Sequence, residues 1–100
     1  MRKVFKYSMP IEDFFRIKMP LGAEILHVAS QKGPDGFETA FLWALVDPVP
    51  RYLVTRFFRL AGTGHPIDAE NARYIGTFQM LSGELVWHVF ELVTDERRGS

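Results

Sequence analysis

Apolar and polar residues alternate along most of this chain with the two-residue period of β-strands. No stretch shows the sustained 3.6-residue period of a long amphipathic helix. The alternating segments are residues 4–7, 14–18, 24–32, 37–47, 52–61, 74–80 and 85–93. Turn signals separate them every 8 to 12 residues or so. We therefore predict an all-β fold, a small sandwich or barrel of about seven short antiparallel strands.

The connections between these segments carry recognisable turn chemistry. Gly33-Pro34-Asp35-Gly36 predicts a β-hairpin turn, because proline presets φ and the last glycine tolerates positive φ. Proline also ends the strands at Pro10 and at Asp47-Pro48-Val49-Pro50. At most one short helical turn is expected, near residues 68–73, with Asp68 as its N-cap.

Two strands have informative faces. Residues 37–47 are apolar on both sides, with Phe41, Trp43 and Leu45 opposite Leu42 and its neighbours. Such a strand is buried on both faces or covered by a partner subunit. In residues 24–32, simple alternation places Ile25, His27 and Ala29 on one face, opposite Leu26, Val28 and Ser30.

The composition limits the class of protein, its partners and its cellular compartment. The 100 residues predict one domain over residues 1–98. Gly99-Ser100 are left out, since such an ending is typical of cloning remnants. Twelve basic and twelve acidic residues balance, so we expect neither duplex nucleic acid nor a membrane surface as a partner. The absence of cysteine, of a secretory signal and of a membrane-length apolar run favours a cytoplasmic protein, and the surplus of large apolar residues favours a homo-oligomer.

The densest candidate chemistry is Gly62-Thr63-Gly64-His65, which follows a strand carrying Arg59. Backbone amides flanked by glycines, a hydroxyl, an imidazole and a guanidinium together favour a phosphate site. The alternative is a tight turn whose glycines serve geometry alone. The motif matches neither a Walker loop nor the dinucleotide fingerprint.

Other residues were considered as parts of the same site. Arg73 converges on the ligand if the turn folds back, and Tyr74 or Trp43 is expected to stack on a nucleobase. Arg56 lies on the opposite strand face from Arg59, so it is expected in a second pocket or in an ion pair with Asp47 or Glu91.

The sequence does not favour a metal, a cofactor or catalysis. His27, His65 and His88 are too widely spaced to form a ligand motif. Thr63, His65 and Asp68 are close in sequence, but their spacing matches no known triad, and we assign no catalytic residue. An enzyme acting on nucleotides through His65 is kept as a minor alternative.

Four segments carry a resemblance over nearly the whole chain. They are Leu42-Trp43-Ala44-Leu45-Val46-Asp47-Pro48, Phe58-Arg59-Leu60-Ala61-Gly62-Thr63-Gly64-His65-Pro66-Ile67, Tyr74-Ile75-Gly76-Thr77-Phe78-Gln79 and Val86-Trp87-His88-Val89-Phe90-Glu91. The chain resembles a family of small uncharacterised bacteriophage and prophage proteins. The resemblance implies an accessory protein in the cytoplasm of an infected or lysogenic bacterium, and it supplies no activity or catalytic residues.

Two hypotheses follow. The first is a homo-oligomeric protein that captures a phosphate-bearing small molecule, such as a cyclic or adenine-type nucleotide immune signal, by sequestration. By analogy of setting and size alone, it is similar to phage sponge proteins. The second is a non-enzymatic inhibitor or structural module that docks on a host or virion protein through its aromatic-rich strand.

Overall fold

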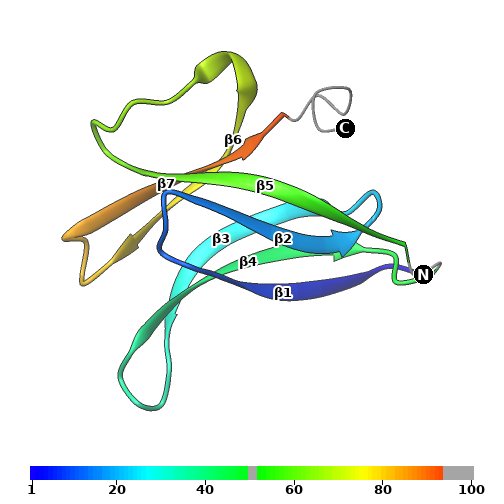
Figure 1. Ribbon diagram of the computed structural model, residues 1–100. Helices are drawn as coiled ribbons and strands as arrows, with labels where there is room; N and C mark the ends of the chain where they lie inside the picture. Colours follow the sequence, from blue (N-terminus) through cyan, green and yellow to red (C-terminus); the bar gives the residue numbers. More distant parts are fainter. Residues whose placement is uncertain (50–51, 94–100) are drawn as a thin grey trace.

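The computed structural model describes residues 1–49 and 52–93, and it has seven strands in two antiparallel sheets that pack face to face (Figure 1). The elements are β1 (Lys3–Met9), β2 (Phe14–Pro20), β3 (Glu24–Lys32), β4 (Glu38–Val46), β5 (Leu53–Gly62), the 3₁₀ turn η1 (Ala69–Asn71), β6 (Ala72–Met80) and β7 (Leu85–Leu92). The predicted all-β class is confirmed, and the architecture is a sandwich.

The two sheets differ in size and meet along one side. Sheet A has the strand order β1-β4-β3, and sheet B has the order β2-β5-β7-β6. Edge strands β3 and β6 pack against each other across the sheets, and the Ser30 hydroxyl donates to the Gln79 carbonyl oxygen at 2.8 Å. A hydrogen bond from a side chain of β3 to the main chain of β6 therefore joins the two sheets on this side of the sandwich.

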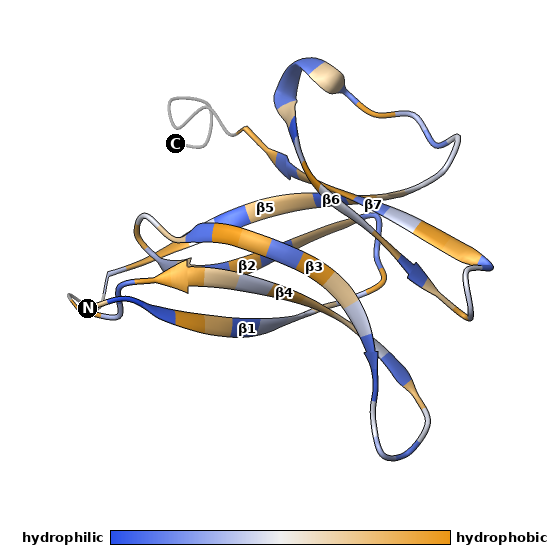
Figure 2. Cartoon of the chain, turned by 180° about the vertical axis from the view of Figure 1, so that it is seen from behind, coloured by the Kyte–Doolittle hydropathy of each residue, from blue (hydrophilic) through white to orange (hydrophobic). Residues whose placement is uncertain are grey.

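The core lies between the sheets and is built from the alternate positions that face inward. On β4 these are Ala40, Leu42, Ala44 and Val46, each at most 1% exposed. The other core residues are Met9, Phe15, Met19, Ala23, Val28, Phe58, Leu60, Phe78 and Val89. Figure 2 shows apolar and hydrophilic bands succeeding one another along β3. The opposite face of β4, with Phe41, Trp43 and Leu45, is only half-buried in the single chain.

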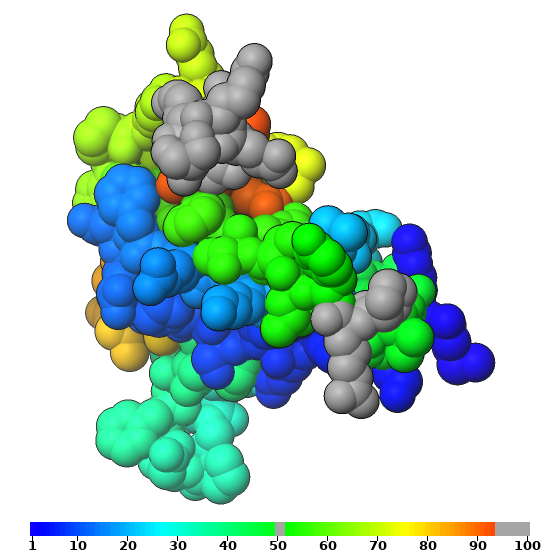
Figure 3. Space-filling model, turned by 45° about the vertical axis from the view of Figure 1, so that its right-hand side comes forward, coloured from blue at the N-terminus to red at the C-terminus, as the bar shows by residue number. Residues whose placement is uncertain are grey.

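The predicted hairpin turn is confirmed. The amide of Gly36 donates to the Gly33 carbonyl oxygen at 2.9 Å, and Gly36 has φ of +85°. The Asp35 carboxylate accepts from the amide of Phe37 at 3.0 Å. The β3–β4 hairpin projects from the body of the molecule (Figure 3).

The predicted faces of β3 are wrong at its start. The pairing of β3 with β4 shifts between Ile25 and His27, so that Leu26 is an extra residue in the ladder. Ile25 therefore packs against the core, whereas His27 faces outward beside Trp43. A bulge adds one residue to one strand, and simple alternation fails across it.

The short helical turn forms within the predicted range, but its predicted cap is wrong. The side chain of Asp68 makes no capping hydrogen bond to the backbone. Its carboxylate accepts instead from the side-chain amide of Asn71 at 2.8 Å. The strand end predicted at Asp47-Pro48-Val49-Pro50 is confirmed, since β4 ends at Val46. Pro50 itself and residues 99–100 lie outside the described residues.

Candidate functional site

The Gly62–His65 segment forms a tight turn that bonds to itself. The amide of His65 donates to the Gly62 carbonyl oxygen at 3.1 Å, and Gly64 has φ of +93°, which favours glycine. The amide of Gly62 donates to His65 Nδ1 at 3.1 Å. A Cβ at Gly62 would lie 3.1 Å from His65 Cε1, so this glycine makes room for the ring. Since Nδ1 accepts, the proton of the neutral ring is on Nε2.

Arg59 holds this connection against the sheet. Its guanidinium donates to the carbonyl oxygens of Leu60 at 2.8 Å, Pro66 at 3.2 Å and Asp13 at 3.3 Å. The side chain is 12% exposed and also lies over the ring of Phe14. Its donors are engaged by the backbone, so Arg59 acts as an internal tether and is poorly placed to bind a ligand.

Thr63 belongs to a chain of hydrogen bonds that ends at Tyr74. Thr63 Oγ1 lies 2.8 Å from His88 Nε2, and Thr77 Oγ1 lies 3.0 Å from His88 Nδ1. The Tyr74 hydroxyl is 2.6 Å from Thr77 Oγ1. These hydrogen bonds fix the His88 ring on the outer face of sheet B, where the hydroxyls of Thr63 and Thr77 bond to its two nitrogens.

A hollow of about 340 Å³ lies beside the turn, between it and β7. Gly62, Thr63 and His65 line it, together with Glu84, Leu85, Val86 and Trp87. The lining holds a carboxylate and no arginine or lysine, so it is poorly suited to a phosphate. The indole N–H of Trp87 has no hydrogen-bond partner among the described residues but is shielded from solvent, so it is not offered to the hollow.

Two arginines surround the carboxylate of Glu91, away from the turn. Arg56 donates to the Glu91 carboxylate from Nε at 2.6 Å and from its NH2 group at 2.8 Å. Arg73 donates to the same carboxylate at 2.7 Å. Arg56 also donates to the Ala23 carbonyl oxygen. Of the two partners predicted for Arg56, the structure has Glu91.

Hydrogen bonds and charge attraction shift the pKa values of the half-buried pair Arg56 and Glu91. Burial alone would raise the pKa of Glu91, but hydrogen bonds and charge attraction from Arg56 and Arg73 outweigh it and leave this pKa below its ordinary value. The hydrogen bond to Glu91 raises the pKa of Arg56. Two guanidiniums and one carboxylate thus leave the cluster with one net positive charge.

This cluster borders a hollow of about 420 Å³ at the corner where β3 meets β6. Arg56, Arg73 and Tyr74 line it, with Ala23, Glu24, Ile25 and Ile75. The second bulge of the sandwich lies here too, between Tyr74 and Gly76 of β6, near the bulge of β3 after Ile25. Bulges are over-represented beside functional sites because they re-aim side chains.

The predicted site residues therefore divide into three groups. Gly62, Thr63, Gly64 and His65 share the turn, and Arg59 tethers it. Arg73 and Tyr74 line the corner hollow. Trp43 lies on the outer face of sheet A, beside His27 and Phe41, and is not brought together with the others.

A family model now places the chain among known sequences. The model for a domain of unknown function, DUF7352, matches residues 1–100. The chain belongs to this family. No curated protein and no solved structure matches the chain.

The DUF7352 chain holds no helix long and apolar enough to cross a membrane, within residues 1–49 and 52–93. The same residues bring together no group of three or more histidine, aspartate and glutamate side chains able to hold a metal ion.

Sequence reasoning missed how this DUF7352 domain joins its polar residues across strands. Glu91 and Arg73 are direct partners in the β6–β7 register, and Thr77 is the partner of His88. Those pairings depend on strand order and on the bulge in β6. Alternation along one strand carries no signal for either.

Proposed function

We propose that this protein is a non-catalytic binding protein that captures a small phosphate-bearing molecule in the corner hollow. The observation that carries the proposal is that two guanidiniums, Arg56 and Arg73, share the single carboxylate of Glu91 at the edge of that hollow. A phosphate supplies the missing negative charge and accepts from the arginine fork.

The two arginines have different parts in this site. The Arg56 side chain is 16% exposed and donates to the Glu91 carboxylate and to the Ala23 carbonyl oxygen, so it contributes charge and holds Glu91 in place. The Arg73 side chain is 64% exposed, and only its NH2 group is bonded to a described residue. Its remaining donors are free to bind the ligand. Glu24 also lines the hollow, and its carboxylate lies 3.9 Å from Arg2, which offsets its charge.

A thermal-shift panel tests the proposal. It contains inorganic phosphate, pyrophosphate, mononucleotides, cyclic dinucleotides and NAD. A ligand at about 100 times its dissociation constant raises the midpoint by on the order of 10 °C for a domain of this size. The shift is expected to vanish in Arg73→Gln, to weaken in Arg73→Lys, and to persist in Lys32→Gln, which removes an exposed charge on the distant hairpin. Equal shifts in Arg73→Gln and wild type would overturn the assignment of the site.

The setting proposed for this activity is the cytoplasm of an infected or lysogenic bacterium, and it follows from the resemblance to phage proteins. There the protein sequesters a nucleotide immune signal. Sequestration predicts stoichiometric binding and complete recovery of the intact nucleotide. Conversion of the bound nucleotide to a product would contradict it.

A second candidate function is docking on a protein, and the outer face of sheet A favours it. Val4, Phe41, Trp43 and Leu45 lie there, with Val4 55% exposed. The Lys6 ammonium lies over the Phe41 ring, 4.0 Å from its centroid. Apolar surface of this kind is typical of subunit and partner contacts. If the surface joins copies of the chain, sedimentation of the wild type gives an oligomer, and Leu45→Arg gives a monomer.

A further inference from the structure

A separate surface lies on the outer face of sheet B, along β2 and β5. Phe14, Arg16 and Lys18 alternate with the inward residues of β2 and point away from the core. Phe57 of β5 is the direct partner of Arg16. Figure 3 shows the side chains of β2, in lighter blue, beside those of β5, in green. We call Phe14, Arg16, Lys18 and Phe57 the β2–β5 stripe.

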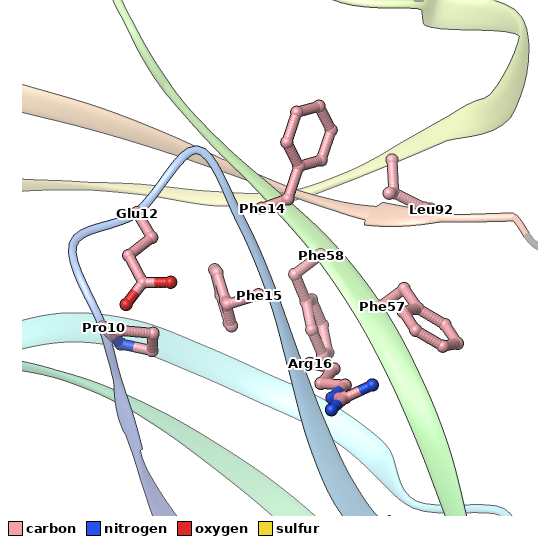
Figure 4. A pocket seen from close by; sticks show the side chains of 8 residues that line it. All are labelled: Pro10, Glu12, Phe14, Phe15, Arg16, Phe57, Phe58 and Leu92. Atoms are coloured by element: carbon pink, nitrogen blue, oxygen red, sulfur yellow. The ribbon is translucent and has the colours of Figure 1, made fainter.

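The stripe offers aromatic rings to solvent. Phe14 is 62% exposed and Phe57 is 38% exposed, although the neighbouring Phe15 and Phe58 stack on each other inside. A hollow of about 470 Å³ lies against these rings, lined also by Pro10, Glu12 and Leu92 (Figure 4). In Figure 4, Phe57 and Leu92 lie on one side of the Phe15–Phe58 pair and Glu12 on the other. The rings of Phe14 and Phe57 are thus open to solvent beside this hollow.

The stripe also carries unneutralised positive charge. Arg16 and Lys18 are exposed, and neither is in an ion pair with any residue in the described ranges. They lie two residues apart on one strand, which separates them by about 7 Å along β2. Arg59, beside Phe14, is 12% exposed, and its NH1 and NH2 groups already donate to backbone carbonyl oxygens.

We propose that the β2–β5 stripe binds single-stranded nucleic acid. Exposed aromatic rings stack on bases of any sequence, and a row of cations follows the phosphate backbone; this pairing is how proteins bind single strands without sequence preference. A duplex hides the faces of its bases from these rings. The stripe is separate from the corner hollow, so the two proposals stand or fall independently.

Fluorescence anisotropy with a labelled single-stranded dodecamer tests this inference. Two neutralised phosphates give a slope of log affinity against log salt of about −1.4, so raising the salt from about 50 to about 200 mM weakens binding roughly sevenfold. A duplex of the same sequence is expected to bind at least about tenfold more weakly than the strand, since stacking is lost.

Variants locate the binding surface. Phe14→Ala and Phe57→Ala are each expected to weaken binding about fivefold or more, and Arg16→Gln to reduce the salt slope by about 0.7. Phe37→Ala and Lys32→Gln remove the same kinds of side chain from the distant hairpin and serve as matched controls, as does Arg73→Gln. Thermal midpoints confirm that each variant is folded. Equal binding by strand and duplex, or no difference between stripe and control variants, would overturn the proposal.

Discussion

Arg59 and Arg73 show that the same type of side chain has opposite roles at two positions of this protein. Both were expected at a ligand site from the sequence. The Arg59 side chain is 12% exposed and its guanidinium is surrounded by carbonyl oxygens, whereas the Arg73 side chain is 64% exposed and has unused donors. Ligand binding requires free donors, so only Arg73 is suited to it.

Replacement of Arg59 by alanine is therefore expected to destabilise the fold and spare ligand binding. It leaves the carbonyl oxygens of Leu60 and Pro66 without their donor, at a cost of about 1–3 kcal/mol of unfolding free energy. Urea unfolding measures this loss. If the variant keeps full stability but no longer binds the ligand, Arg59 belongs to the site and its role as a tether is wrong.

At the scale of elements, the corner between β3 and β6 depends on Gly76, which has no side chain. A Cβ at Gly76 would lie 2.8 Å from Val28 Cγ2, closer than real contacts allow. Gly76 directly follows the bulge in β6, and Val28 is a buried core residue of β3. The close approach lets the two sheets meet beside the corner hollow.

Gly76→Ala is expected to cost about 1–3 kcal/mol of unfolding free energy through overpacking. Because the clash is with Val28, the loss is expected to be smaller when Val28→Ala is already present, and a double-mutant cycle measures this coupling. Additive losses in the cycle would show that the two sheets do not press together at this point.

The elements were predictable because their signals are local. Alternating residues gave seven strands, and Gly33-Pro34-Asp35-Gly36 gave the hairpin turn, since neither depends on strand order. The faces of β3 could not be predicted past Leu26, because a bulge is fixed by the partner strand. The pairing of Arg73 with Glu91 depends in the same way on the β6–β7 register. For this reason the sequence could single out Arg73 but could not predict that it lies at the corner hollow, apart from the Gly62–His65 turn.

At the scale of the whole molecule, charge is balanced overall and uneven locally. Twelve acidic residues offset twelve basic residues, yet Arg56 and Arg73 share the carboxylate of Glu91. The pKa of Glu91 is lower in the folded protein than in the unfolded chain, so ionised Glu91 stabilises the fold. This contribution is complete above the unfolded pKa near 4.5 and is lost as the pH falls through the folded pKa.

The pH dependence of unfolding is expected to reflect this group. At neutral pH, Glu91→Gln should lower the unfolding free energy by about 1.5–3 kcal/mol, since it removes charged hydrogen bonds. The difference from wild type should shrink as the pH falls below about 4.5, where Glu91 of the unfolded chain is protonated. Glu70→Gln, at an exposed position, is the control. A difference that stays constant from neutral to acidic pH would contradict the role given to Glu91.

The most direct test of the central claim, an anion site at the corner of the sandwich, is a titration followed by NMR of the arginine side chains. Pyrophosphate is added to labelled protein, and the Nε–Hε signals of Arg56, Arg59 and Arg73 are followed. The account predicts saturable shifts of the Arg73 signal, smaller shifts for Arg56 and none for Arg59, which does not line the corner hollow. An Arg73 signal that does not move, or Arg59 shifting as much as Arg73, would contradict it.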